Sequence, residues 1–359
     1  MTARHRSSAA WLALAYALLV VYASLYPFEG WRWPPGRTAR DLALLPEAIH
    51  HDAFDIWSNG LGYVPMGLLL ALAGLLAALL SYGCEWLQHF VPQRVPTRGD
   101  FQLNVAGALG GALLAWALQA GGLVDRWGRL RRRWFAGDAA YALALLVLWP
   151  LGLLFPAPAP LALGHAIDGG RAWLAEVLEG VSWASSLQPL LQPPADGLLQ
   201  MPPLAEFAAT TLGLLAPCLV AFVVTPRGWR RVGLALGALA LGVAAMTLST
   251  ALNFGPHNAL AWLGPRTLLA LVAGLLLALA CARLAPRLLC GLGLMALAAL
   301  VAVVAQAPAD PYLAQSLQGW EQGRFVRFHG LAQWLGWLWP WLAMAWLLAR
   351  LGRPPRAPG

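Results

Sequence analysis

Long apolar runs recur along this chain of 359 residues, and they constrain its fold more than any other feature. A helix needs about 20 predominantly apolar residues to cross a bilayer, because its backbone hydrogen bonds must be satisfied internally there. Charged residues make up only 11% of the chain, against about 25% in a typical soluble domain. The sequence therefore predicts an all-α, polytopic transmembrane helix bundle of about eight to ten spans. The clearest runs cover residues 9–26, 101–120, 137–155, 204–224, 232–252, 265–282, 288–305 and 331–349.

The basic residues predict how this bundle is oriented. All 24 of them are arginines, and most gather in short links between the apolar runs. Because cytoplasmic loops carry an excess of positive charge, we expect these links and both chain termini to lie in the cytoplasm. This distribution accounts for the net charge of +8 without a nucleic-acid partner, and it leaves membrane lipids as the expected surroundings. The links lie at 126–133, 227–231, 283–287 and 350–356.

The stretch from residue 55 to residue 91 is the ambiguous part of this topology. If the N-terminus and the link at 126–133 are both inside, the run at 101–120 must enter from outside, so 55–91 must begin and end outside. Two full spans need roughly 40 residues plus a turn, whereas this stretch has 37 and contains Pro65 and Gly74. Two short helices that meet near Gly74 and a re-entrant hairpin both fit.

Polar residues interrupt the apolar pattern of the first third in three short groups. Each group repeats at helical spacing, so its side chains share one helix face. In the predicted topology, all three groups converge at the outer end of the bundle, where Arg94 and Arg98 are the expected partners of Glu85 and Asp100. The groups are Asp55, Asn59, Tyr63, Pro65 and Gly67; then Ser81, Glu85 and Gln88; and then Asp100, Asn104, Gly107 and Gly111.

These polar residues have a structural and a functional interpretation. Asp55 and Asp100 could be helix N-caps, and the amide side chains could join helices by hydrogen bonds worth about 0.6 kcal/mol on average. Gly107 and Gly111 form a GxxxG pattern, which is typical of close helix packing. Ionisable residues inside a membrane, however, usually mark a functional site. We assign no catalytic residue, and Glu85 and Asp100 are the candidates for a general base.

Metal and cofactor sites are not indicated. The cysteines form no CxxC pair, and His50, His51 and Asp52 have no clear further ligands, so a solvated loop is the simpler interpretation. No phosphate-binding loop, nucleophile elbow, HExxH or dinucleotide fingerprint is present. We therefore expect no metal and no cofactor. The cysteines are Cys84, Cys218, Cys281 and Cys290.

At its three polar groups the sequence resembles the VanZ-like family, named for a membrane protein associated with teicoplanin resistance. The resemblance covers roughly residues 10–120 and rests on the order of the groups together with their membrane context. The residues that carry it are Asp55, Asn59, Tyr63, Pro65, Gly67, Glu85, Gln88, Arg98, Asp100, Asn104, Gly107 and Gly111.

The resemblance implies an inner-membrane protein that acts on the envelope side and reduces susceptibility to lipid-tailed glycopeptide antibiotics. A non-enzymatic role of this kind is the first hypothesis, and its expected partners are a lipid-linked cell-wall precursor or the lipoglycopeptide itself. The alternative is a membrane enzyme that acts on a lipid or lipid-linked substrate, with Arg94 or Arg98 as a phosphate contact. A transporter is the third hypothesis, although the later spans show no paired interrupted helices.

The chain is expected to divide at its first basic link. Residues 1–125 would form the VanZ-like transmembrane domain, and residues 137–359 a second transmembrane helical region of unassigned function. Two longer connections in the second region, Pro156 to Pro203 and Gln306 to Gly330, are expected outside. The first is expected to contain an amphipathic helix, with Trp173 on its apolar face, that lies at the membrane surface, and the second has a similar pattern.

Overall fold

The structure is a computed structural model, and every regular element in the part that it describes is a helix. The predicted all-α fold is thereby confirmed. The described residues are 9–25, 28, 30–38, 40–47, 53–69, 74–164, 178, 201–307, 312–313 and 326–352. Within these ranges, the side chains of residues 9–10, 53–58, 74–75 and 326–331 are left out.

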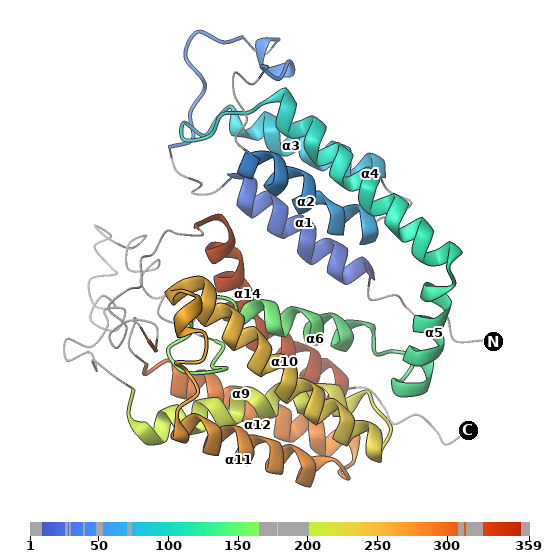
Figure 1. The fold of residues 1–359 in the computed structure, drawn as a ribbon, viewed down its shortest axis with the longest axis vertical. Coiled ribbons are helices and arrows are strands. Elements are labelled where there is room, and N and C mark those ends of the chain that lie inside the picture. The colour runs from blue at the N-terminus through green and yellow to red at the C-terminus, as the bar shows by residue number, and fades with distance from the viewer. Residues whose placement is uncertain are drawn as a thin grey trace. The chain divides into compact units, whose positions relative to one another are not determined.

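The chain splits into two compact units, Met1–Arg133 and Trp134–Gly359. Unit 1 contains five α-helices and the short 3-10 helix η1 in the part that is described (Figure 1). Its elements are α1 (Ala9–Leu25), η1 (Asp41–Ala43), α2 (Ala53–Leu69), α3 (Gly74–Gln88), α4 (Arg98–Ala120) and α5 (Leu123–Trp134). The division into a VanZ-like transmembrane domain at 1–125 and a second transmembrane region of unassigned function at 137–359 stays a prediction.

Helices α2 and α4 run parallel in direct backbone contact. A Cβ atom added at Gly107 would lie 1.9 Å from the carbonyl oxygen of Gly60, and one at Gly111 would lie 2.1 Å from that of Val64. Only glycine leaves room for this approach, which is how membrane helices pack without a hydrophobic driving force between them. The close-packing interpretation of the GxxxG pattern is therefore correct, and α2 supplies its own small residue, Gly60, opposite it.

The stretch from 55 to 91 contains two helices in the part that is described. α2 has 17 residues and α3 has 15, so at 1.5 Å per residue they are about 25 Å and about 22 Å long. Each is shorter than the ~30 Å hydrocarbon core of a bilayer. Two short crossings and a re-entrant hairpin therefore both remain compatible with this geometry.

Unit 2 is a bundle arranged around α9. This helix packs against α6, α10, α11 and α12 (Figure 1), and 15 of its 21 residues are buried. Proline occupies the first position of α9, α11 and α12, where its missing N–H would have no partner in the helix anyway. The helices are α6 (Ala140–Gly152), α9 (Pro203–Val223), α10 (Trp229–Phe254), α11 (Pro265–Cys281), α12 (Pro286–Val304) and α14 (Val326–Leu351), with the 3-10 helix η3 (Pro256–Asn258).

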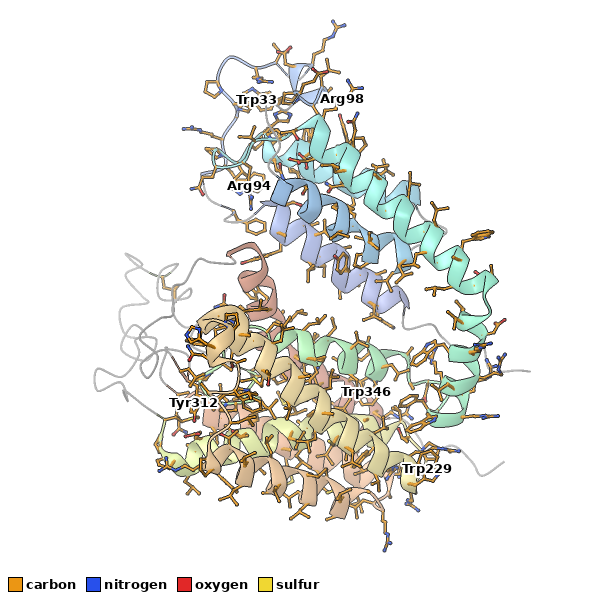
Figure 2. The ribbon with its side chains drawn as sticks, viewed as in Figure 1. Trp33, Arg94, Arg98, Trp229, Tyr312 and Trp346 are labelled. Carbon is orange, nitrogen blue, oxygen red and sulfur yellow. The ribbon has the colours of Figure 1, made fainter. Side chains whose placement is uncertain are left out.

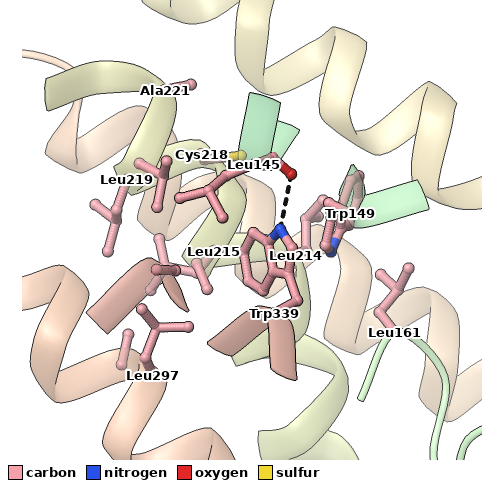
Figure 3. Close-up of a cluster of buried hydrophobic side chains, with 14 of the residues drawn as sticks. Leu145, Trp149, Leu161, Leu214, Leu215, Cys218, Leu219, Ala221, Leu297 and Trp339 are labelled. Carbon is pink, nitrogen blue, oxygen red and sulfur yellow. Dashed lines mark hydrogen bonds between the residues drawn. The ribbon is translucent and has the colours of Figure 1, made fainter. Parts of the chain in front are cut away.

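The core of unit 2 joins helices that are distant in the sequence. The buried indole of Trp339 on α14 donates a hydrogen bond of 2.7 Å to the carbonyl of Leu145 on α6 (Figure 3). This bond satisfies the polar atom of a side chain that is otherwise packed among leucines, as buried tryptophans require. This bond holds α14 against α6, although the two helices lie near opposite ends of the sequence of unit 2.

The connection that follows α6 begins with a segment that enters the core of unit 2. Ala159, Leu161 and Leu163 are buried in the core of unit 2. Gly213 on α9 makes room for this segment, because a Cβ atom there would lie 2.4 Å from the carbonyl oxygen of Leu161. The rest of the expected surface segments, including the region around Trp173, lies outside the described residues.

Four helices in the described part, α4, α9, α10 and α12, are long and apolar enough to cross a membrane. Apolar stretches of α1, α6 and α11 are shorter. The chain is thus a multi-pass membrane protein, while the predicted number of spans, the choice of the inner membrane and the orientation of the termini stay predictions.

Candidate functional site

The predicted polar residues lie at one end of unit 1. Helices α1 and α3 end there, and α2 and α4 begin there. Gln88 at the end of α3 donates a hydrogen bond of 3.1 Å to the carbonyl of Ser24 on α1. Asn59 near the start of α2 donates to the carboxylate of Asp100 on α4. We call this the polar end of unit 1.

Glu85 faces the first turn of α4. Its side chain is buried, with 4% of its surface exposed, and its carboxylate accepts a hydrogen bond of 3.1 Å from the backbone N–H of Thr97. Thr97 is the N-cap of α4, because its hydroxyl accepts from the backbone N–H of Asp100 at 3.0 Å. The carboxylate of Glu85 therefore lies where the α4 dipole is positive, a position that stabilises negative charge.

The interpretation of Asp100 as a helix N-cap is wrong, because Thr97 takes that role. Asp100 lies three residues later, which leaves its carboxylate available to Asn59. The spacing Thr97-x-x-Asp100 resembles a capping box, with aspartate in place of glutamate or glutamine. That spacing was the sequence signal that could have identified the cap. The side chain of Asp55, the other N-cap candidate, lies outside the described residues.

A second polar layer lies one turn deeper. Asn104 on α4 donates a hydrogen bond of 3.0 Å to the hydroxyl of Ser81 on α3, and both side chains are buried. Tyr63 on α2 is buried near Ser81 and Glu85. Neither the Tyr63 hydroxyl nor the carbonyl oxygen of Asn104 has a partner in hydrogen-bond geometry among the described residues. Unused hydrogen-bonding groups of this kind are rare in native interiors and are available to a ligand or to water.

The two expected arginine partners differ in their surroundings. Arg94 is half-buried, donates to the carbonyl of Ala23 at 2.9 Å, and is the positive charge that acts on Glu85. Arg98 is exposed and lies 4.0 Å from the carboxylate of Glu47. The expected pairing of Arg94 and Arg98 with Glu85 and Asp100 stays a prediction, and sequence reasoning did not single out Glu47.

A basic and aromatic loop covers the polar end. The backbone N–H of Arg32 donates to the carbonyl of Phe90 at 3.0 Å, and the Trp33 ring packs edge-to-face on Phe90 with centroids 5.6 Å apart. Trp33, Arg94 and Arg98 all lie at this end of unit 1 (Figure 2). With Arg37 and Arg40 in the same exposed loop, the polar end carries five arginines; they are Arg32, Arg37, Arg40, Arg94 and Arg98.

Histidines add little to this site. His89, just beyond the end of α3, is half-buried, and burial together with the charge of Arg37 lowers its pKa. His50, His51 and Asp52 lie outside the described residues, as does the side chain of His329. Among the residues that the structure describes, no three His, Cys, Asp or Glu side chains are grouped to hold a metal ion.

Unit 2 holds a polar group that sequence reasoning missed. Glu206, in the first turn of α9, is buried. The Tyr312 hydroxyl is close enough to interact with the charges of Glu206 and Arg266. In the sequence, Glu206 lies shortly after two prolines at the start of a long apolar run. This position is typical of an ordinary acidic residue in the first turn of a helix.

Comparisons with known proteins match the first third of the chain. The family model described as VanZ/LLP1 matches residues 10–119, which include α1 to α4 and the whole polar end. Searches of curated proteins and of solved structures found no match. The matched segment contains each of the three polar groups that suggested the resemblance, and the resemblance is confirmed. Residues 10–119 thus match the VanZ/LLP1 family model, and the match does not cover the second helical unit.

Proposed function

We propose that the VanZ-like domain acts through its polar end on a lipid-linked component of the cell envelope, and that this action reduces susceptibility to teicoplanin. The observation that carries the proposal is the buried carboxylate of Glu85, held against the N-terminus of α4 with Asp100 and Arg94 nearby. A buried ionisable group on a membrane helix is costly unless it faces a partner or a wet cavity. Its placement beside unused polar atoms supports a binding role.

The covering loop supports an anionic partner. Five arginines and the exposed rings of Trp31 and Trp33 surround the polar end. Guanidinium groups bind phosphate in a forked geometry, and tryptophans favour the boundary between lipid and water. A lipid-linked cell-wall precursor presents both a phosphate and a hydrocarbon chain at that boundary. The outward orientation of this end is part of the proposal.

Susceptibility to teicoplanin tests the proposal directly. The chain would be expressed in a teicoplanin-susceptible host, and the inhibitory concentrations of teicoplanin and vancomycin would be measured. We expect selective protection against teicoplanin. Glu85→Gln and Asp100→Asn should each reduce the protection to the level of the empty vector, because each removes a charge without changing side-chain shape. Glu47→Gln is the matched control, since its carboxylate is exposed at the same end.

Membrane levels of all variants must match for the comparison to count. Full protection by both Glu85→Gln and Asp100→Asn would contradict a role for the carboxylates of the polar end. Absence of protection by the unmodified chain would contradict the antibiotic part of the proposal, although not the family assignment.

The enzymatic alternative has its own observation. A buried carboxylate with an arginine nearby could remove a proton from a substrate that the arginine holds by its phosphate. A comparison of lipid extracts from cells with and without the chain distinguishes catalysis from binding. A product that disappears with Glu85→Gln would favour catalysis, whereas identical extracts together with teicoplanin protection would favour binding.

A further inference from the structure

Helix α5 lies outside the segment that matches the VanZ/LLP1 family and follows a membrane-crossing helix directly. α4 ends at Ala120, and only Gly121 and Gly122 separate it from α5. Gly122 has φ +69°, a conformation that glycine adopts at no steric cost, so the chain turns here. Because α4 is one of the helices able to cross a membrane, α5 begins at the boundary between lipid and water.

The far end of α5 lies at the same kind of boundary. Its last residue, Trp134, packs edge-to-face on Trp229 with ring centroids 5.1 Å apart. Trp229 is the first residue of α10, another helix long and apolar enough to cross a membrane, and it is exposed (Figure 2). Both ends of α5 are thus tied to the end of a membrane-crossing helix.

The side chains of α5 separate into two faces. At 3.6 residues per turn, its apolar residues fall within one arc of about 120°. Opposite them lie one aspartate and four of the five arginines of the helix. No residue of α5 is buried, and about half of the surface of each apolar side chain before Trp134 is exposed. Those apolar residues are Leu123, Val124, Trp127 and Leu130.

Such a helix has the composition of an interfacial membrane helix rather than of a soluble one. A strongly charged, arginine-rich face opposite a face of leucine and tryptophan places a helix in the plane of the membrane surface. Positive side chains near that surface are attracted to anionic lipids. The fifth arginine, Arg131, is half-buried at the edge of the apolar face, where a long side chain can extend toward the headgroups.

We propose that α5 lies in the membrane–water interface and binds anionic phospholipid headgroups, with Leu123, Val124, Trp127 and Leu130 in the acyl region. This contact anchors α5 at one leaflet. It is independent of the polar end of unit 1, because α5 follows the turn at the far end of α4 from Asp100.

The test uses the full chain in lipid nanodiscs, made of phosphatidylcholine with or without phosphatidylglycerol. The four native cysteines are replaced by alanine, and one cysteine is introduced by Leu130→Cys on the apolar face or by Asp125→Cys on the charged face. Each carries an environment-sensitive fluorophore. We expect nitroxide lipids to quench the Leu130 probe and aqueous iodide to quench the Asp125 probe. Phosphatidylglycerol should strengthen the contrast, and high salt should weaken it.

Charge removal measures the lipid preference. Replacing Arg129, Arg132 and Arg133 by glutamine should weaken the docking of α5 on the surface of phosphatidylglycerol discs. The equilibrium constant between the docked helix and the helix in water should fall about fivefold for each arginine removed. The matched control replaces Arg227, Arg283 and Arg287, which are exposed in other basic links, and it should leave docking unchanged. Equal quenching of both probes by iodide would overturn the proposal by placing α5 in water. Protection of both probes from iodide and from nitroxide lipids would overturn it by placing α5 against protein.

Discussion

Arg231 shows how a single side chain can join the ends of separate membrane helices. It is 1% exposed, although it belongs to the first turn of α10, where a cation is unfavourable for its own helix. Its guanidinium donates to the carbonyls of Thr225, Ala282 and Leu284, at distances of 2.9–3.0 Å. These carbonyls follow the ends of α9 and α11, so the charge lies where both of those helix dipoles are negative.

We predict that Arg231→Leu strongly destabilises unit 2. The substitution leaves the carbonyls at two helix ends without donors, and each unsatisfied buried group costs roughly 1–3 kcal/mol. Arg231→Lys should retain part of the stability, because an ammonium keeps the charge but cannot fork between two sites. Thermal unfolding in detergent would measure the loss. Arg287→Leu is the control, since Arg287 is exposed, and an equal shift for both leucine variants would contradict the assignment.

At the scale of elements, the packing of α2 on α4 positions the polar end. The contact is so close that the backbone of one helix touches the other at Gly67, Gly107 and Gly111. This approach brings Asn59 within hydrogen-bond reach of Asp100. Pro65 lies inside α2 and removes one helical donor. The Tyr16 hydroxyl on α1 donates to the carbonyl of Gly62 in the same turn, which joins α1 to α2.

We predict that Gly107→Ala separates α2 from α4 and disturbs the polar end. The added Cβ atom would lie 1.9 Å from the Gly60 carbonyl oxygen, so the helices must move apart. The expected loss of stability is roughly 1–3 kcal/mol, and teicoplanin protection should fall with it. Gly110→Ala is a control in the same helix, because a Cβ atom there meets nothing within 4 Å. It should raise stability slightly through helix propensity. Similar melting temperatures for both variants would argue against the close contact.

At the scale of the whole molecule, the basic links of unit 2 gather at one end of that unit. Arg227 and Arg231 both donate to the carbonyl of Leu284, next to the link at 283–287. Arg350 pairs with Asp138. Trp229 marks this end, and Tyr312 lies at the other end of the unit (Figure 2). One end of unit 2 therefore carries the positive charge that orients membrane proteins.

We predict that this end faces the cytoplasm, as the positive-inside tendency requires. Fusions of green fluorescent protein after Arg133, Arg283 and Gly359 should fluoresce, whereas alkaline phosphatase at the same points should be inactive. Fusions after Pro46, in the loop over the polar end of unit 1, should give the opposite pattern. Active phosphatase after Arg283 would reverse the topology. The polar end of unit 1 would then face inward if the fusions after Pro46 also reversed.

Five arginines at the polar end of unit 1 do not follow the positive-inside tendency if that end is outside. The opposite end of the unit, at α5, is also basic. Because both ends of unit 1 carry arginines, the positive-inside tendency can account for only one of the two arginine clusters. A bound anion at the polar end would explain one of them, and this is the physical link between the topology and the proposed function.

Local sequence was sufficient to predict the long apolar helices of this protein and the order of its polar residues, but not helix α5. Apolar runs 17 or more residues long appear as α1, α9, α10, α11 and α12, because backbone hydrogen bonding in lipid leaves few alternatives to a helix. The spacing of Asn59, Glu85, Asp100 and Asn104 placed them at helix ends that should converge. These properties depend on neighbours within a few turns along the chain, which periodicity reports.

The partner of each polar group was decided by the tertiary structure. The sequence did not predict that Thr97 would cap α4 and bind Glu85, that Arg98 would approach Glu47, or that Arg231 would be buried. It also did not predict that the segment around Leu161 would be buried in the core, where Gly213 makes room for it. Each outcome depends on a glycine or a carbonyl in a distant helix. Each hydrogen-bond donor bonds to an acceptor that helix packing brings close to it. The spacing of residues along the sequence does not predict which acceptor that is.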